Sequence, residues 1–258
     1  MTRWIAAAGA FVVSLDSTVN VAFPAMAAAF TIPPERVRWI IICYVFCYAL
    51  TSFAGGALGD RVGHARVFAA GLALSAAAFV LAGAAPTFGW LLLARVVQGV
   101  GGGCVYGTAP GLVTLAVPPP QRGRALGFLN AAIGLGLSVG PLAAGVLVGA
   151  LGWRSVFLVR LPVALLVLAW VLLAARAAAG PAPARLLAPP VLARAAVLVP
   201  GALAFVANAG IFAIGLLVPF YLIGARGLGA VAAGVLFTRT PLGTTLAAPV
   251  AGRLADRI

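Results

Sequence analysis

Charge is scarce in this chain, and lysine is absent. The 258 residues include seventeen arginines, four acidic residues and one histidine, and charged residues make up 8% of the sequence. Hydrophobic residues make up 64%. A soluble globule needs more charge than this on its surface, so the composition excludes a water-soluble fold and predicts a polytopic membrane protein.

Reactive side chains are equally sparse. Asp16, Glu35, Asp60 and Asp256 do not cluster in the sequence, and His64 has neither a nucleophile nor a set of metal ligands near it. The three cysteines lie in apolar runs without a Cys-x-x-Cys pair, which argues against a disulfide framework or a metal site. We therefore expect no metal and no cofactor, and we do not expect an enzyme.

The arginines indicate a membrane orientation rather than a nucleic-acid partner. They are scattered between apolar runs and form no basic stripe with interleaved aromatic residues, so nucleic-acid binding is not expected despite the net charge of +13. With the N-terminus in the cytoplasm, ten arginines fall on the inner side and four on the outer side, which the positive-inside rule favours. The composition, rich in Ala, Gly and Arg, suggests the cytoplasmic membrane of a bacterium.

Apolar runs long enough to cross a bilayer as helices of about 20 residues recur along the chain. Backbone groups in lipid must be satisfied within the spanning segment, and the alternation of a barrel strand is missing from these runs. We therefore predict an all-α fold with eight transmembrane helices, at Trp4–Ala29, Val37–Leu58, Val67–Ala84, Trp90–Val117, Ala125–Leu151, Val156–Ala175, Ala195–Leu222 and Ala230–Ala251.

A polar, proline-rich interruption divides these helices into six and two. It predicts a six-helix bundle at residues 1–176, a cytoplasmic linker at 177–194 and the first two helices of an incomplete second bundle at 195–258. A repeat agrees with two related halves, because Gly55–Val62 recurs as Ala251–Ile258 at an offset of 196 with four identical positions. The interpretation is a C-terminally truncated chain whose partners include the remaining C-terminal helices.

Asp16 is the one carboxylate inside an apolar run. It lies twelve residues past Trp4, roughly 18 Å along a helix, and therefore near the middle of the membrane. A carboxylate there costs several kcal/mol unless it is paired, hydrated or protonated, so Asp16 is suited to carry a proton or to neutralise a cation. The alternative is a structural Asp that nearby hydroxyl groups hold in order to fix a helix contact.

Two intramembrane arginines are candidate partners of Asp16. Arg95 lies five residues past Trp90 on a helix that enters from outside, and Arg239 lies nine residues past Ala230. Either one could meet Asp16 if their helices adjoin, and an Arg–carboxylate pair could open when a proton or a substrate arrives. The alternative for Arg95 is a side chain that reaches out to the lipid headgroups.

Glycine and a short charged loop mark two further candidate sites. Gly136 and Gly140 form a small-xxx-small pair, and Pro141 removes a helical hydrogen bond, so this helix serves either as a hinge or for tight packing.

The loop Gly59–Arg66 sets Asp60 beside arginines and predicts a charge latch at the cytoplasmic surface. We expect His64 in that loop to be solvated.

Four segments resemble signatures of the major facilitator superfamily. Gly56–Gly63 resembles the loop signature between the second and third helices, and Arg95–Gly99 resembles that of the fourth helix. Gly136–Gly145 is similar to the fifth-helix signature of the antiporters, and Leu15–Pro24 is similar to the first-helix signature of the drug:proton antiporters. Whether the chain follows the 12-helix or the 14-helix plan stays open.

The resemblance implies two six-helix bundles that rock around a substrate cavity, with a proton gradient as the energy source. It assigns Asp16, Asn20, Arg95 and Gln98 to that cavity and to proton coupling, with Arg239 as the competing candidate. The implied cytoplasmic gate loop comprises Gly56, Asp60, Arg61, Gly63 and Arg66. The repeat of this loop comprises Gly252, Asp256 and Arg257. The implied antiporter helix at the bundle interface comprises Gly136, Gly140, Pro141 and Gly145.

The leading hypothesis is a secondary transporter that exports small lipophilic compounds in exchange for protons. Two alternatives stay open: a truncated fragment without transport activity, and a family member that moves another metabolite. Three intramembrane arginines against one intramembrane carboxylate fit poorly with a cationic substrate, so neutral or anionic compounds remain candidates.

Overall fold

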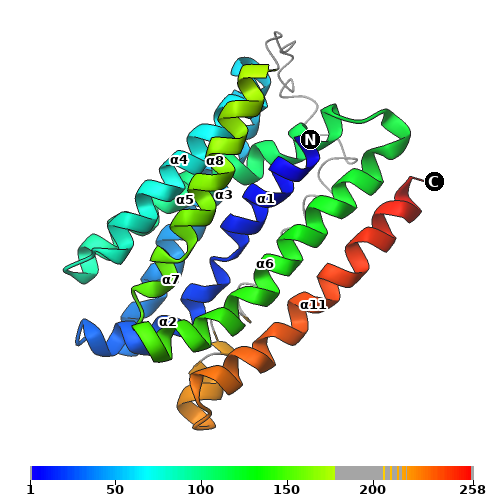
Figure 1. Ribbon diagram of the computed structural model, residues 1–258. Coiled ribbons are helices and arrows are strands. Elements are labelled where there is room, and N and C mark those ends of the chain that lie inside the picture. The colour runs from blue at the N-terminus through cyan, green and yellow to red at the C-terminus, as the bar shows by residue number, and fades with distance from the viewer. Residues whose placement is uncertain are drawn as a thin grey trace.

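The computed structural model describes residues 2–177, 206, 210, 214, 217, 218 and 220–256, and these are almost entirely helical (Figure 1). The predicted all-α class is therefore confirmed. The predicted linker, apart from residue 177, and most of the seventh predicted helix, 195–222, lie outside the described residues.

The helices follow the apolar runs of the sequence. Within the described residues, six segments are long and apolar enough to cross a membrane, and α11 is a further long helix of 26 residues. The elements are α1 (Thr2–Ser14), α2 (Ser17–Ala29), α3 (Pro34–Val62), α4 (His64–Gly83), α5 (Phe88–Leu115), η1 (Pro119–Gln121), α6 (Arg122–Leu151), α7 (Ser155–Leu158), α8 (Arg160–Ala177), η2 (Phe220–Ala225) and α11 (Ala230–Ala255).

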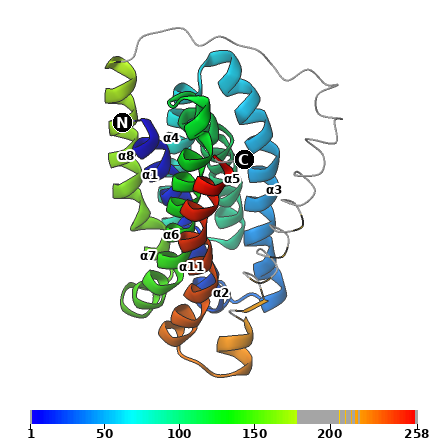
Figure 2. The same cartoon turned by 90° about the vertical axis from the view of Figure 1, so that its right-hand side faces the viewer.

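The long helices run side by side, with the N-terminus and the C-terminal end of α11 at the same end of the molecule (Figure 1). Helix α6 lies between α1 and α11, and it packs on both. Helices α3 and α8 form opposite flanks in Figure 2, with α4 and α5 packed between them. The first span therefore lies inside the bundle, where its polar residues are kept away from lipid.

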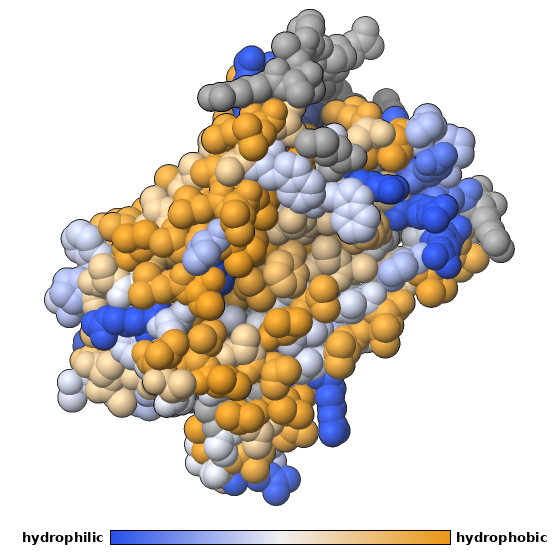
Figure 3. Space-filling view, in the orientation of Figure 1, coloured by the Kyte–Doolittle hydropathy of each residue, from blue (hydrophilic) through white to orange (hydrophobic). Residues whose placement is uncertain are grey.

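The outer surface is apolar, as a bilayer requires. Large hydrophobic side chains such as Phe46, Leu50 and Phe53 on α3 are exposed. Figure 3 shows hydrophobic residues over much of the middle of the molecule and hydrophilic residues mainly toward its ends. Two buried apolar clusters lie inside, one around Ala10 and Phe68, the other around Phe23 and Phe157.

The first span is broken, which corrects the prediction of one continuous helix from Trp4 to Ala29. Helix α1 ends at Ser14 and α2 begins at Ser17. At the break, backbone hydrogen bonds join residues three apart in the sequence instead of four. The N–H of Asp16 donates to Val13 O and that of Thr18 donates to Leu15 O, both at 3.0 Å. The two clusters lie on either side of this break, which places Asp16 between them.

Glycine allows α4 and α5 to approach each other closely. A Cβ atom added at Gly101 would lie 2.6 Å from Ser75 Oγ and 2.7 Å from the backbone oxygen of Gly71. Lipid offers no hydrophobic drive for helices to associate, so such close packing is a main source of attraction between them.

We predict that Gly101→Val lowers the free energy of unfolding by about 1–3 kcal/mol, because the added side chain forces α4 away from α5. The measurement is the thermal unfolding midpoint in detergent. Gly149→Val is the matched control, since an added Cβ at Gly149 on α6 meets nothing within 4 Å. Equal midpoints for the two variants would contradict the prediction.

Candidate functional site

The Asp16 carboxylate lies at the break between α1 and α2, and its side chain is 14% exposed. Both of its oxygens bind Arg95: Nη1 donates to Oδ1 at 2.6 Å, and Nη2 donates to Oδ2 at 2.7 Å. The side-chain amide of Gln98 adds a third hydrogen bond, from Nε2 to Oδ1 at 2.7 Å. Bidentate Arg–carboxylate pairs are among the strong hydrogen-bonded pairs in proteins, and this one neutralises the charge of Asp16 inside the membrane.

The Arg95 guanidinium makes further contacts with α3 and α5. Its Nε donates to the backbone oxygen of Ile40 on α3 at 3.1 Å, and its Nη1 also donates to Gln98 Oε1 at 2.7 Å. The Tyr44 ring covers the guanidinium at 4.3 Å from its centroid. Arg95 is 1% exposed, so it does not reach the lipid headgroups as the alternative interpretation proposed. Helices α3 and α5 therefore fix the direction from which Asp16 is bound.

Arg160, the third intramembrane arginine, is a second cationic partner of Asp16 that was not predicted from the sequence. Its Nη1 donates to Asp16 Oδ1 at 3.0 Å, and its Nε donates to the backbone oxygen of Val156 at 2.9 Å. The guanidinium packs against the ring of Phe79 at 4.4 Å from the centroid. The one feature of the sequence that could have indicated this contact is the position of Arg160 within an apolar run.

The other two predicted cavity residues lie apart from this ion pair. Arg239 is exposed on α11, and the structure pairs Asp16 with Arg95 and Arg160 instead. The reason is topological, because α6 lies between α1 and α11 (Figure 1). Asn20 is half-buried on α2, one helical turn beyond Asp16.

A row of tyrosines adjoins the ion pair, and the sequence analysis did not identify it. Tyr44 and Tyr48 on α3 stack at 5.9 Å between centroids, and Tyr48 meets Tyr106 on α5 edge to face at 5.3 Å. The Tyr106 hydroxyl lies 2.5 Å from Ser14 Oγ, beside the break in the first span. The four-residue spacing of Tyr44 and Tyr48 was the available signal, since it puts them on one helix face.

The glycines of α6 face this break. An added Cβ at Gly136 would lie 2.7 Å from Phe11 O and from Ser14 Cβ, and one at Gly140 would collide with Ser17 Oγ. Ser17 Oγ also donates to Gly136 O at 3.4 Å. Pro141 and Gly145 are buried in the same helix, which continues unbroken through Pro141. The predicted antiporter segment therefore packs on the first span.

The opposite side of the same segment contacts α11. Thr238 Oγ1 donates to the backbone oxygen of Ser138 at 2.9 Å. Nearer the other end of α6, an added Cβ at Gly127 would lie 2.7 Å from Ala248 O, and one at Gly252 would lie 2.9 Å from the Cα of Gly127. Helix α6 thus connects the Asp16 break with α11 along its whole length.

The predicted gate loop is almost entirely helical, which corrects its assignment as a loop from Gly59 to Arg66. Helix α3 continues to Val62 and α4 begins at His64, so Gly63, with φ of 101°, is the one residue between them. Its backbone conformation is one that side chains other than glycine rarely adopt.

His64 is not solvated as expected. Its side chain is 12% exposed, and its Nε2 lies 3.4 Å from Asp60 Oδ1. The chain folds His64 back toward α5, where an added Cβ at Gly111 would collide with its ring. Gly56 packs against the backbone oxygen of Gly107 on α5, whereas Arg61 and Arg66 are exposed.

In the repeat of the gate segment, Asp256 caps the start of α6. Its Oδ1 accepts from the backbone N–H of Gly123 at 2.6 Å, and its Oδ2 accepts from that of Arg124 at 2.8 Å. The first N–H groups of a helix have no partner within it, and they carry partial positive charge, so a carboxylate is stabilised there. Arg257 lies outside the described residues.

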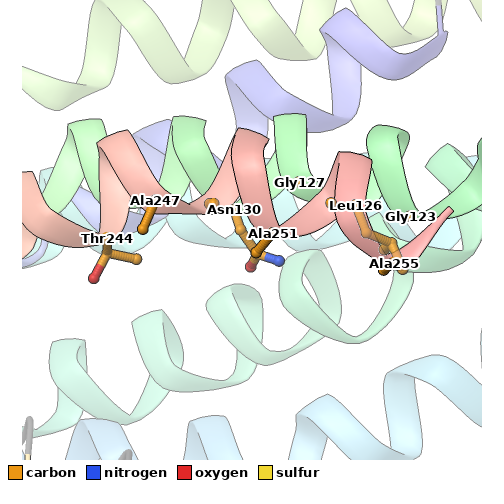
Figure 4. A pocket seen from close by; sticks show the side chains of 10 residues that line it. Gly123, Leu126, Gly127, Asn130, Thr244, Ala247, Ala251 and Ala255 are labelled. Atoms are coloured by element: carbon orange, nitrogen blue, oxygen red, sulfur yellow. The ribbon is translucent and has the colours of Figure 1, made fainter. Parts of the chain in front are cut away.

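An open groove of about 540 Å³ follows the seam between α6 and α11. Figure 4 shows its side chains pointing toward α5, away from α1, with Asn130 and Thr244 as polar groups. The remaining lining consists of small or apolar residues, namely Gly123, Leu126, Gly127, Ala247, Ala248, Ala251, Gly252 and Ala255. Within the described part of the chain, no cluster of three or more His, Cys, Asp or Glu residues forms a metal site.

The chain is similar in sequence to known proteins. A profile of the Major Facilitator Superfamily matches residues 5–258. The Probable actinorhodin transporter of Streptomyces coelicolor is 39% identical over 60% of this chain and 28% of its own length. The Puromycin resistance protein pur8 of Streptomyces alboniger is 37% identical over 64% and 34%.

A third relative, the Riboflavin transporter RibZ of Clostridioides difficile, is 30% identical over 61% of this chain and 35% of its own length. The chain thus spans about a third of the length of the curated relatives it matches. Two of these relatives are named as transporters and one as a resistance protein.

We predict that Asp256→Ala separates the ends of α6 and α11, because loss of an N-cap acceptor costs a helix about 1 kcal/mol, or roughly a fivefold shift between contact and separation. The measurement is the distance between spin labels at Gln121, which is exposed directly before α6, and at Leu254, which is exposed near the end of α11, in a variant without the native cysteines. Asp60→Ala is the control, since it removes an acid that does not contact α6. An unchanged distance in Asp256→Ala would contradict the prediction that the Asp256 cap holds the ends of α6 and α11 together.

Proposed function

Because the chain belongs to the major facilitator superfamily of membrane transporters, we propose that it takes part in proton-driven export of small lipophilic compounds by alternating access. In this proposal the substrate cavity lies next to Asp16, between the six-span bundle and the second bundle to which α11 belongs. The energy source is the proton gradient, and no cofactor is required.

The observation that carries the proposal is a single ionisable carboxylate inside the bundle, held by an opposite charge and still partly exposed. Asp16 binds Arg95 through both oxygens, and 14% of its side chain remains accessible. A group that is both paired and reachable can exchange its arginine partner for a proton. Breaking a buried ion pair costs about 3–5 kcal/mol, which is large enough to drive a conformational equilibrium.

The contacts around Asp16 suggest how protonation changes the bundle. A neutral Asp16 no longer requires the bidentate contact with Arg95, so the short hydrogen bonds at the α1–α2 break are free to rearrange. Ser14 and Ser17 at this break press on Gly136 and Gly140, and α6 carries the movement to α11. Release of the Asp256 cap at the other end of α6 would then open the cytoplasmic side.

The names of the relatives, which refer to transport or to drug resistance, support the proposal. One is called a transporter of actinorhodin, another a puromycin resistance protein, and a third a Putative multidrug resistance protein, MdtD, of Klebsiella pneumoniae at 37% identity over 62% of this chain. We propose the same broad class of cargo here, small lipophilic compounds. The tyrosine row beside Asp16 supplies aromatic surface on which such compounds can stack.

The orientation proposed is N-terminus inside, in the cytoplasmic membrane of a bacterium. The excess of arginines on that side supports it, and the N-terminus and the end of α11 lie at the same end of the molecule (Figure 1). By the repeat that relates the end of α3 to the end of α11, Asp60 is the counterpart of Asp256 and would face a helix among those that complete the second bundle.

We predict that Asp16→Asn leaves the full-length protein folded in the membrane but reduces proton-driven export at least tenfold, since the amide keeps the shape and cannot exchange a proton. The measurement is efflux of a fluorescent lipophilic compound from proteoliposomes with an imposed pH gradient. Glu35→Gln is the control, because Glu35 is exposed at the start of α3. Export at the wild-type rate by Asp16→Asn would refute the assignment.

A further inference from the structure

The centre of the bundle holds more positive than negative charge. Asp16 is bound by two arginines, Arg95 at 2.6 Å and Arg160 at 3.0 Å. An arginine side chain does not lose its proton in a protein, so both guanidiniums are charged. With one carboxylate between them, this cluster carries a net charge of about +1 when Asp16 is ionised, and of about +2 when Asp16 is protonated.

No other acidic residue of the chain offsets this excess. The sequence has four acidic residues in all, and the remaining three lie at helix ends: Glu35 in the first turn of α3, Asp60 near its last turn, and Asp256 at the end of α11. Asp60 and Asp256 are already engaged, by His64 and by the start of α6.

The two arginines differ in how completely they are bound. Arg95 has acceptors at Nε, Nη1 and Nη2, supplied by Ile40, Gln98 and Asp16. Arg160 is fully buried, yet its Nη2 has no hydrogen-bond partner in the described part of the chain. Arg95 is therefore sufficient to hold Asp16, and Arg160 adds a positive charge that the protein itself leaves without full compensation.

We infer that Arg160 is a specificity-determining residue, which excludes cationic compounds from the central cavity and leaves it to lipophilic compounds that carry no positive charge. This inference rests on the proposed function and narrows its substrate class. A monovalent cation about 8 Å from the excess charge is disfavoured by about 10- to 30-fold at an effective dielectric constant of about 20. The exclusion holds in both protonation states of Asp16, since protonation increases the positive charge.

The test compares two lipophilic ions of the same shape and opposite charge, tetraphenylphosphonium and tetraphenylborate. Their binding to the full-length protein in nanodiscs is measured at one pH without a proton gradient, and binding to empty nanodiscs is subtracted. We expect wild type to bind tetraphenylborate at least tenfold more tightly than tetraphenylphosphonium. Arg160→Gln should gain about tenfold in affinity for tetraphenylphosphonium, because the excess charge is gone.

Two controls separate charge from structure. Arg160→Lys keeps the positive charge and should retain the wild-type preference, whereas Arg38→Gln removes an exposed arginine outside the site and should change neither affinity. If Arg160→Gln fails to fold, the preference of wild type and of Arg160→Lys decides the matter. Tighter or equal binding of the phosphonium by wild type, or binding of neither ion, would overturn the inference.

This outcome is independent of proton coupling. Binding is measured at equilibrium, so a protein that exports without protons would still discriminate between the two ions. Conversely, Asp16→Asn can abolish proton-driven export while wild type binds both ions equally, and that result would overturn the role of Arg160 alone.

Discussion

The need of one carboxylate for donors inside a bilayer organises the middle of this bundle. Asp16 receives hydrogen bonds from Arg95 and Gln98 on α5 and from Arg160 at the start of α8. Arg95 in turn requires the backbone oxygen of Ile40 on α3. Four spans therefore meet at one polar centre, with an apolar cluster on each side of it. Because an unpaired charge is so costly in lipid, these contacts fix how the spans are rotated relative to one another.

The same centre is connected to the periphery through close contacts of short side chains with backbone atoms. The break at Asp16 abuts Gly136 and Gly140, and the far side of α6 abuts α11 along glycine and threonine positions. Only short side chains lie between the helices at these contacts, so little space is left there. The break at Asp16 and the cap formed by Asp256 therefore both contact α6.

Much of this arrangement could be predicted from the sequence, and the failures share a cause. The apolar runs predicted the helices. The similar depths of Asp16 and Arg95 in the membrane predicted that the two side chains could pair, and in the structure they do. Depth alone could not separate Arg95, Arg160 and Arg239, because it says nothing of the direction in which a side chain points or of which helices are neighbours. The break at Leu15–Asp16 and the burial of His64 were missed for the same reason, since both depend on contacts with distant segments.

In the core of a soluble protein, the same hydrophobic side chains both hold helices together and determine which helices pair. In this bundle, different residues perform these two tasks. Lipid solvates leucine as well as another leucine does, so hydrophobic side chains cannot specify which helices pair. Here close approach is supplied by glycines, as at Gly71 and Gly101 or Gly127 and Gly252, and specificity is supplied by Asp16. In the described part of the chain, close packing and polar pairing therefore depend on different residues, so a substitution at Asp16 leaves the glycine contacts between α4 and α5 in place.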